Sequence, residues 1–218
     1  SYLFGGVEVS PKVVKEIVAT FLKTETANVN SSTLIDNTAI PGSVLIHRMY
    51  SELSKKGFKV KNAAKVKTYG DLESILFNGL LKNERDSHNH SEDSKIDYMN
   101  SVQKNGESGI GIDIESVDNL PDSNDYFDDQ FYIDNFSKKE IAYCSSKQNP
   151  KSCFCGRFAA KEAIVKADNT FLDINFSDIE IKVSSKGAPL FEGMDISISH
   201  LNVGDIRLST AIAKKIGK

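Results

Sequence analysis

Residues 82–107 divide the chain into two parts, and this break constrains the fold more than any other feature. The stretch begins Lys-Asn-Glu-Arg-Asp-Ser-His-Asn-His-Ser and contains no periodic pattern of apolar residues. A segment of this composition cannot bury enough apolar surface to join a packed core. We therefore expect two folded units, residues 1–81 and residues 108–218, joined by a flexible polar linker at residues 82–107.

The composition of the 218 residues argues against several classes of protein. The net charge of −3 provides no basic excess for binding nucleic acid. No apolar run reaches membrane-spanning length and no signal peptide precedes the fold, so we expect no membrane partner and a cytoplasmic location. Cys144, Cys153 and Cys155 cannot all pair with one another, which favours free thiols in a reducing compartment. Because residue 1 is a serine, we interpret the chain as a piece of a longer polypeptide.

The first unit shows helical patterns in three places. A Ser-Pro pair begins residues 10–22, where apolar pairs repeat at helical spacing. A second helix is predicted for residues 43–56, followed by a glycine that stops it. A third begins near Thr68, where Asp71 completes a capping box. These patterns predict an all-α bundle.

The first predicted strand of the second unit carries two acidic residues. Residues 109–117 alternate apolar and polar side chains after a glycine, as in a half-buried strand. A period of two places Asp113 and Glu115 on one face, and we expect Ile112 and Ile114 to point into the core from the other. Acidic residues on a strand usually face solvent, so this strand alone does not identify a site.

Residues 157–166 have the composition of a helix, with alanines, long side chains and no glycine or proline. Helical spacing places Glu162 and Lys166 on one face, with Arg157 and Lys161 as an adjacent cationic stripe. One interpretation is a solvated helix with i,i+4 ion pairs. The other joins Glu162 to the two strand carboxylates as hard oxygen ligands of the kind that Mg²⁺ prefers, with the cations holding a polyanion.

The remaining patterns predict an α+β fold for the second unit. Apart from the strand at 109–115, we expect helices near 137–146 and 157–167 and strands at 178–184, 188–191, 195–199 and 206–213.

Four segments of this unit resemble the 4′-phosphopantetheinyl transferases, in the order found in that family. They are Gly111-Ile-Asp113, residues 136–143 (Phe-Ser-Lys-Lys-Glu-Ile-Ala-Tyr), residues 156–167 (Gly-Arg-Phe-Ala-Ala-Lys-Glu-Ala-Ile-Val-Lys-Ala) and residues 196–200 (Ile-Ser-Ile-Ser-His). The Ser-His element follows the Lys-Glu-Ala helix, which is similar to the order in small holo-acyl-carrier-protein synthases and in the transferase domain ending the fungal fatty acid synthase α chain. The resemblance covers residues 109–213.

This resemblance implies that coenzyme A donates its phosphopantetheine arm to a serine of a carrier protein. By similarity, Asp113 and Glu162 would hold Mg²⁺ against the pyrophosphate, with Glu115 as a third ligand, directly or through water. The serine would be deprotonated by Glu162 or by a metal-polarised water, and the sequence does not decide between them.

The resemblance also implies roles for the basic residues. Lys166 would neutralise a phosphate oxygen, while Arg157 and Lys161 would hold the phosphates of the nucleotide. His200 would bind the nucleotide or relay a proton, although a lone histidine after a strand is more often structural.

Small transferases of this type assemble as trimers with active sites between subunits, so the resemblance implies a homotrimer. They usually carry an arginine a few residues after the metal-binding aspartate, which grips acidic carrier proteins. Asp118 and Asn119 occupy that region here.

Residues 7–78 resemble an acyl carrier protein, because three helices follow one another with a long loop between the first two. The resemblance implies that Ser43 carries a 4′-phosphopantetheine arm. The usual Asp-Ser-Leu of carriers is Gly42-Ser43-Val44 here, and the second helix is basic where carriers are acidic. The alternative is that Ser43 is only an N-cap in a degenerate domain.

Two hypotheses follow for the whole chain. In the first, the transferase and its fused carrier are mutually adapted and serve a fatty acid or polyketide synthase, with carrier proteins, its own or others, as partners. In the second, the chain is a non-catalytic docking or structural module of a large synthase.

Overall fold

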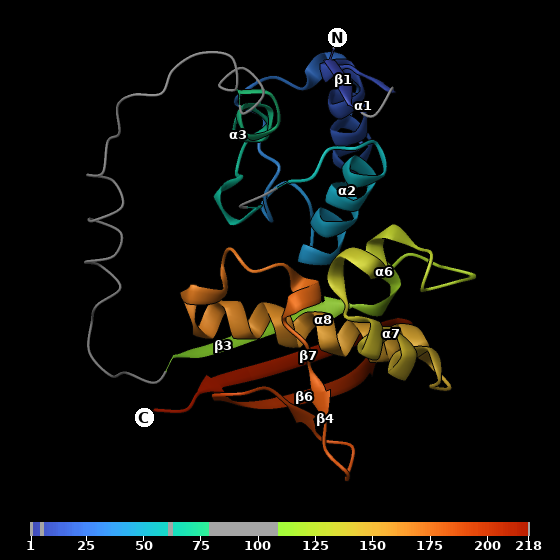
Figure 1. The fold of residues 1–218 in the computed structure, drawn as a ribbon, viewed down its shortest axis with the longest axis vertical. Coiled ribbons are helices and arrows are strands. Elements are labelled where there is room, and N and C mark those ends of the chain that lie inside the picture. Colours follow the sequence, from blue (N-terminus) through green and yellow to red (C-terminus); the bar gives the residue numbers. More distant parts are fainter. Residues whose placement is uncertain (1, 5–6, 61–62, 79–108, 218) are drawn as a thin grey trace.

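The computed structural model describes residues 2–4, 7–60, 63–78 and 109–217 (Figure 1). The predicted linker at residues 82–107 lies outside the described residues. No helix in the described part of the chain is long and apolar enough to cross a membrane. In chain order the elements are β1 (Tyr2–Phe4), β2 (Val7–Val9), α1 (Pro11–Leu22), η1 (Thr26–Asn28), α2 (Ser43–Lys55), η2 (Ala63–Lys65), α3 (Tyr69–Glu73), η3 (Ser74–Asn78), β3 (Ile110–Ser116), η4 (Val117–Asn119), α6 (Gln130–Asn135), α7 (Lys138–Ser145), α8 (Pro150–Ala167), η5 (Asn169–Phe171), η6 (Phe176–Asp178), β4 (Lys182–Val183), β5 (Pro189–Leu190), β6 (Met194–Val203) and β7 (Ile206–Lys215).

The first unit is helical, as its sequence predicts, except for a short hairpin of β1 and β2 that the sequence did not reveal. The Ser10 hydroxyl accepts the Lys12 amide at the start of α1. Thr68 and Asp71 form the predicted capping box at the start of α3. The apolar faces of the helices meet in one core, which includes Val14, Val18, Met49, Leu53 and Leu72.

The second unit has the predicted α+β fold. Its antiparallel sheet has the order β3-β7-β6, and α8 lies across one face of it (Figure 1). Small residues make this close approach possible: a Cβ on Gly111 would lie 1.9 Å from the Ala163 carbonyl oxygen of α8. Asp168, just after α8, forms an ion pair with Lys215 of β7 at 2.6 Å and fixes the end of the helix to the sheet.

The expected orientation of β3 is wrong. Asp113 and Glu115 point inward against α8, whereas Ile112 and Ile114 are 58% and 60% exposed on the opposite face. The two-residue alternation holds, but the inward-facing residue at position 111 must lack a side chain, because the α8 backbone approaches it too closely for a Cβ. The face opposite α8 is therefore the one that presents apolar side chains to the surroundings.

Other differences concern element lengths and the cysteines. Helix α8 begins at Pro150, seven residues before the predicted start at residue 157, and α6 was not predicted. Strand β4 is shorter than expected. Cys144 of α7 and Cys153 of α8 form a disulfide, so the prediction of three free thiols is wrong for these two. Cys155 is a free, buried thiol.

Candidate active site

Three carboxylates gather where α8 lies against β3. Asp113 and Glu115 of β3 are both buried, with 7% and 3% of their surfaces exposed. Glu162 of α8 lies near enough that its charge raises the pKa of both strand carboxyls. The close packing of helix on sheet therefore brings together the three acidic residues that the sequence singled out.

Burial is the main cause of the raised pKa of both strand carboxyls. It raises the pKa of Asp113 to about 6, although the hydrogen bond from Lys166 opposes the rise. It raises the pKa of Glu115 to about 8, and the negative charges of Asp113 and Glu162 add to this, while amide donors at the start of α2 oppose it. Buried groups that repel one another in this way are stabilised in their charged form by a nearby cation.

Two carboxylate oxygens of the cluster accept no hydrogen bond and could bind a cation. Asp113 Oδ2 and Glu115 Oε2 are buried without a hydrogen-bond partner, which is costly for a charged group. Asp113 Oδ1 accepts from Lys166 Nζ at 2.7 Å, and the half-exposed lysine also reaches the Ile112 carbonyl at 3.2 Å. Within the part of the chain that the structure describes, no three Asp, Glu, His or Cys side chains already surround a metal position. The donor types nonetheless fit Mg²⁺, which takes a few carboxylates and fills its shell with water and phosphate oxygens.

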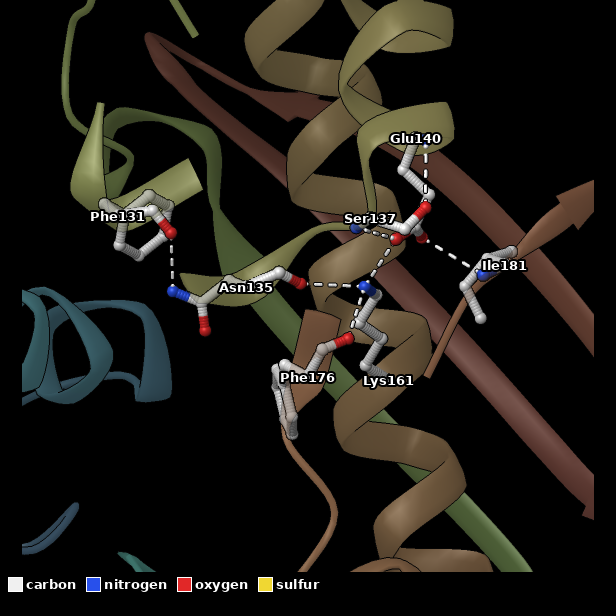
Figure 2. A network of polar contacts seen from close by, with 7 residues as sticks. All are labelled: Phe131, Asn135, Ser137, Glu140, Lys161, Phe176 and Ile181. Carbon is white, nitrogen blue, oxygen red and sulfur yellow. Dashed lines mark hydrogen bonds and ion pairs between the residues drawn. The ribbon is translucent and has the colours of Figure 1, made fainter. Parts of the chain in front are cut away.

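The structure gives Lys161 a different role from the phosphate contact that the resemblance implied. Its ammonium is fully buried and donates to Glu140 Oε2 at 2.7 Å, to the Asn135 carbonyl at 2.7 Å and to the Phe176 carbonyl at 2.8 Å (Figure 2). Burial lowers the pKa of Lys161, and the Glu140 carboxylate opposes that shift. An ammonium has three donors, so none is left here for a nucleotide phosphate.

Arg157 and His200 lie together in a second cluster. Arg157 lies over the ring of Tyr143 at 4.4 Å, and its Nε is buried without a partner. His200 Nδ1 is 2.8 Å from the Ser209 hydroxyl, and burial, followed by the charge of Arg157, lowers the pKa of His200. The strand register pairs Glu115 with Ser209 and Ser209 with His200. Two strand spacings, roughly 10 Å, therefore separate the backbones of Glu115 and His200.

Ser43 lies at the carboxylate cluster, although it comes from the first unit. Its backbone N–H donates to Glu115 Oε1 at 3.1 Å, so an acidic side chain of the second unit caps α2. The N-cap residue is Gly42, with φ of +96°, which has no side chain of its own to cap the helix, so the interpretation of Ser43 as an N-cap is wrong. A Cβ on Gly42 would lie 3.3 Å from both Glu115 Oε2 and Asn119 Nδ2.

Helix α2 makes further contacts with the second unit through residues that were not assigned to a site. Val44 is fully buried in an aromatic cluster that includes Phe131 and Phe158. His47 lies 3.5 Å from Glu162, and Arg48 donates to the Asn119 carbonyl at 2.8 Å. The signal that could have revealed them was the unexpected basic character of this helix.

The chain matches the 4′-phosphopantetheinyl transferase superfamily over residues 109–211. It is 44% identical over 82 residues to the holo-[acyl-carrier-protein] synthase of Halothermothrix orenii, covering 37% of this chain and 66% of that protein. It is 37% identical over 101 residues to the same enzyme of Chlorobaculum tepidum, covering 42% and 86%. It is also 28% identical over 152 residues to the fatty acid synthase subunit alpha of Saccharomyces cerevisiae, covering 67% of this chain and 8% of that protein.

The chain thus spans slightly less than two thirds of the first of these relatives and a small part of the fungal subunit. The Chlorobaculum enzyme is covered over most of its length at more than a third identity. The match lies in the unit that holds Asp113, Glu162 and Lys166. Through residues 109–211 the chain therefore belongs to the 4′-phosphopantetheinyl transferase superfamily, as a domain of the holo-[acyl-carrier-protein] synthase type.

Proposed function

We propose that the transferase domain, residues 109–217, moves the 4′-phosphopantetheine arm of coenzyme A to Ser43 of its own first unit. The observation that carries this proposal is the hydrogen bond from the Ser43 N–H to Glu115 Oε1, at 3.1 Å. This contact joins residues 72 positions apart and holds the candidate acceptor serine beside the β3 and α8 carboxylates. The carrier role of the first unit is part of the same proposal, supported by its three helices and the serine at the start of the second.

The residues present suit phosphoryl transfer. The attacked phosphorus belongs to a charged pyrophosphate, so the reaction depends on positioning and on neutralising charge more than on covalent help. Asp113, Glu115 and Glu162 would hold Mg²⁺, which when bound would neutralise the pyrophosphate. Lys166 is half-exposed and can exchange Asp113 for a phosphate oxygen. Glu162 would accept the proton of the serine hydroxyl if it acts as the general base.

Arg157 and His200 would contact the nucleotide end of coenzyme A. Their place in a second cluster, roughly 10 Å from Glu115, suits a ligand whose phosphates are spread along its length. The buried, unpartnered Nε of Arg157 and the partly exposed imidazole of His200 are the donors offered there. Lys161 takes no part in this binding.

A homotrimer would give the exposed sheet face a partner. Ile110, Ile112, Ile114 and Ile212 lie on the face of β3 and β7 opposite α8, each more than 40% exposed. Contiguous apolar surface of this kind typically marks an interface. Second copies of the chain are the occupants that we propose, in a fatty acid or polyketide synthase assembly.

Mass spectrometry of the full chain incubated with coenzyme A and Mg²⁺ tests the function. We expect an added mass of about 340 Da, that of one phosphopantetheine arm, on the peptide containing Ser43. Ser43→Ala should abolish the adduct while leaving coenzyme A binding intact, and Asp113→Ala and Glu162→Ala should each slow its formation at least ~100-fold. An unmodified parent chain that still binds coenzyme A would instead favour the non-catalytic docking module.

A further inference from the structure

One histidine of α2 reaches deep into the transferase domain. The His47 ring centroid lies 5.0 Å from that of Phe158 and 4.6 Å from that of Phe176, and its side chain is 22% exposed. The first of these ring pairs is perpendicular. Contacts of this kind add to the free energy gained by burying the rings.

The polar atoms of this histidine are matched as well. His47 Nδ1 lies 2.7 Å from Asn135 Oδ1, while the Asn135 side-chain amide donates to the Phe131 carbonyl at 2.8 Å. That second bond fixes the amide with its oxygen toward the histidine (Figure 2 shows the Asn135 and Phe131 pair), so Nδ1 carries the hydrogen. The Asn135 backbone is held in turn by the buried Lys161. Asn135, Phe158, Phe176 and Glu162 form a rigid socket, which we call the His47 socket.

Arg48, the next residue of α2, donates to the Asn119 carbonyl at 2.8 Å. In both contacts the donors are on α2 and the acceptors are on the transferase domain. An acidic side chain at either position of α2 would face Asn135 Oδ1, the Glu162 carboxylate or the Asn119 carbonyl, each of which would repel it.

The socket also determines where the acceptor serine lies. His47 follows Ser43 by four residues, about one helical turn or ~6 Å. A fixed His47 therefore holds the start of α2 against Glu115, and Gly42 leaves room for that carboxylate.

We propose that His47 and Arg48 are specificity-determining, positioning residues, through which the transferase domain selects its own fused carrier and rejects carriers with an acidic second helix. This inference rests on the proposed transfer to Ser43. Under this proposal, the choice of carrier depends on two side chains of the carrier, His47 and Arg48, and on the His47 socket of the transferase domain.

The test measures the first-order rate of Ser43 modification in the full chain by mass spectrometry, with coenzyme A and Mg²⁺. His47→Ala and Arg48→Glu should each slow the reaction about 30-fold, as expected for residues that dominate a contact. The dissociation constant for coenzyme A should stay within about twofold, because neither side chain belongs to the nucleotide site. Lys56→Ala, which removes an exposed cation at the end of the same helix, should leave the rate unchanged.

Two further measurements separate selection from folding. His47→Gln keeps an N–H donor for Asn135, so it should recover much of the rate lost in His47→Ala, whereas His47→Phe should recover less. An acidic acyl carrier protein added in trans to the Ser43→Ala chain should be modified at least ~10-fold more slowly than Ser43 of the parent at the same effective concentration.

The outcomes distinguish the two proposals. A parent chain without the adduct overturns the proposed function and this inference with it. If the parent is modified and His47→Ala and Arg48→Glu are modified as fast as the parent, the inference alone is overturned. A trans carrier that is modified as fast as Ser43 has the same consequence.

Discussion

The buried ammonium of Lys161 leads to a sharp prediction about stability. Replacing it with methionine removes the only charge partner drawn for Glu140 in Figure 2 and leaves two carbonyls without their donor. The Glu140 carboxylate would keep the Ser137 amide at 2.9 Å and the Ile181 amide at 3.1 Å, but it would lose its ion-pair partner. Breaking a buried pair in this way typically costs about 3–5 kcal/mol of unfolding free energy.

Denaturant unfolding of the full chain measures this loss. A cost of that size corresponds to a fall in the melting temperature of roughly 10 °C for a chain of this length. Lys139→Met is the matched control, because Lys139 is 84% exposed and 3.7 Å from Glu180, and it should change the unfolding free energy by less than ~0.5 kcal/mol. Adding Glu140→Gln to Lys161→Met should recover about 1–3 kcal/mol, since the orphaned charge is then removed.

Coenzyme A binding by the folded variant provides the decisive comparison. If Lys161 is structural, calorimetry should find the affinity of Lys161→Met within about threefold of the parent at a temperature where both are folded. A phosphate-binding lysine would give the opposite result, an affinity at least ~10-fold lower with little change in stability. That result would refute the assignment of Lys161 to the core.

Three further predictions concern other parts of the fold. Burial raises the pKa of Asp168, but Lys215 at 2.6 Å and nearby hydrogen bonds lower it more, so the net pKa is lowered. The ionised form therefore stabilises the fold above about pH 4. In denaturant unfolding, Asp168→Asn should cost about 1 kcal/mol at pH 7 and progressively less as the pH falls through the lowered pKa. Gly42→Ala should slow Ser43 modification at least ~10-fold, because its Cβ would crowd the β3 carboxylate, whereas Gly57→Ala has a similar positive φ with nothing within 4 Å and should lower stability without slowing the reaction comparably. Ile112→Asp should reduce the molar mass measured by light scattering to that of one chain while the thermal unfolding transition persists; an unchanged mass would contradict an interface on this face.

Local signals in the sequence predicted much of the secondary structure. The helices α1 and α3 begin at the expected caps, because the side-chain and backbone groups that form these caps lie within a few residues of one another. The alternation in β3 was equally visible, since it depends only on the two-residue period of a strand. The hairpin of β1 and β2 was not predicted, and neither was the short α6, although Asp129 caps its start.

The residue types of the site, two strand carboxylates and a helical glutamate among cations, could be read from the sequence, together with their order along the chain. Which face of β3 is inward could not, because that depends on how closely the α8 backbone approaches Gly111. The tertiary packing likewise places Lys161 against Glu140 inside the core and brings the Ser43 amide to the Glu115 carboxylate. Both contacts join residues far apart in sequence, and the balance between desolvation and pairing that governs such groups is set by the packing around them, which no local pattern encodes.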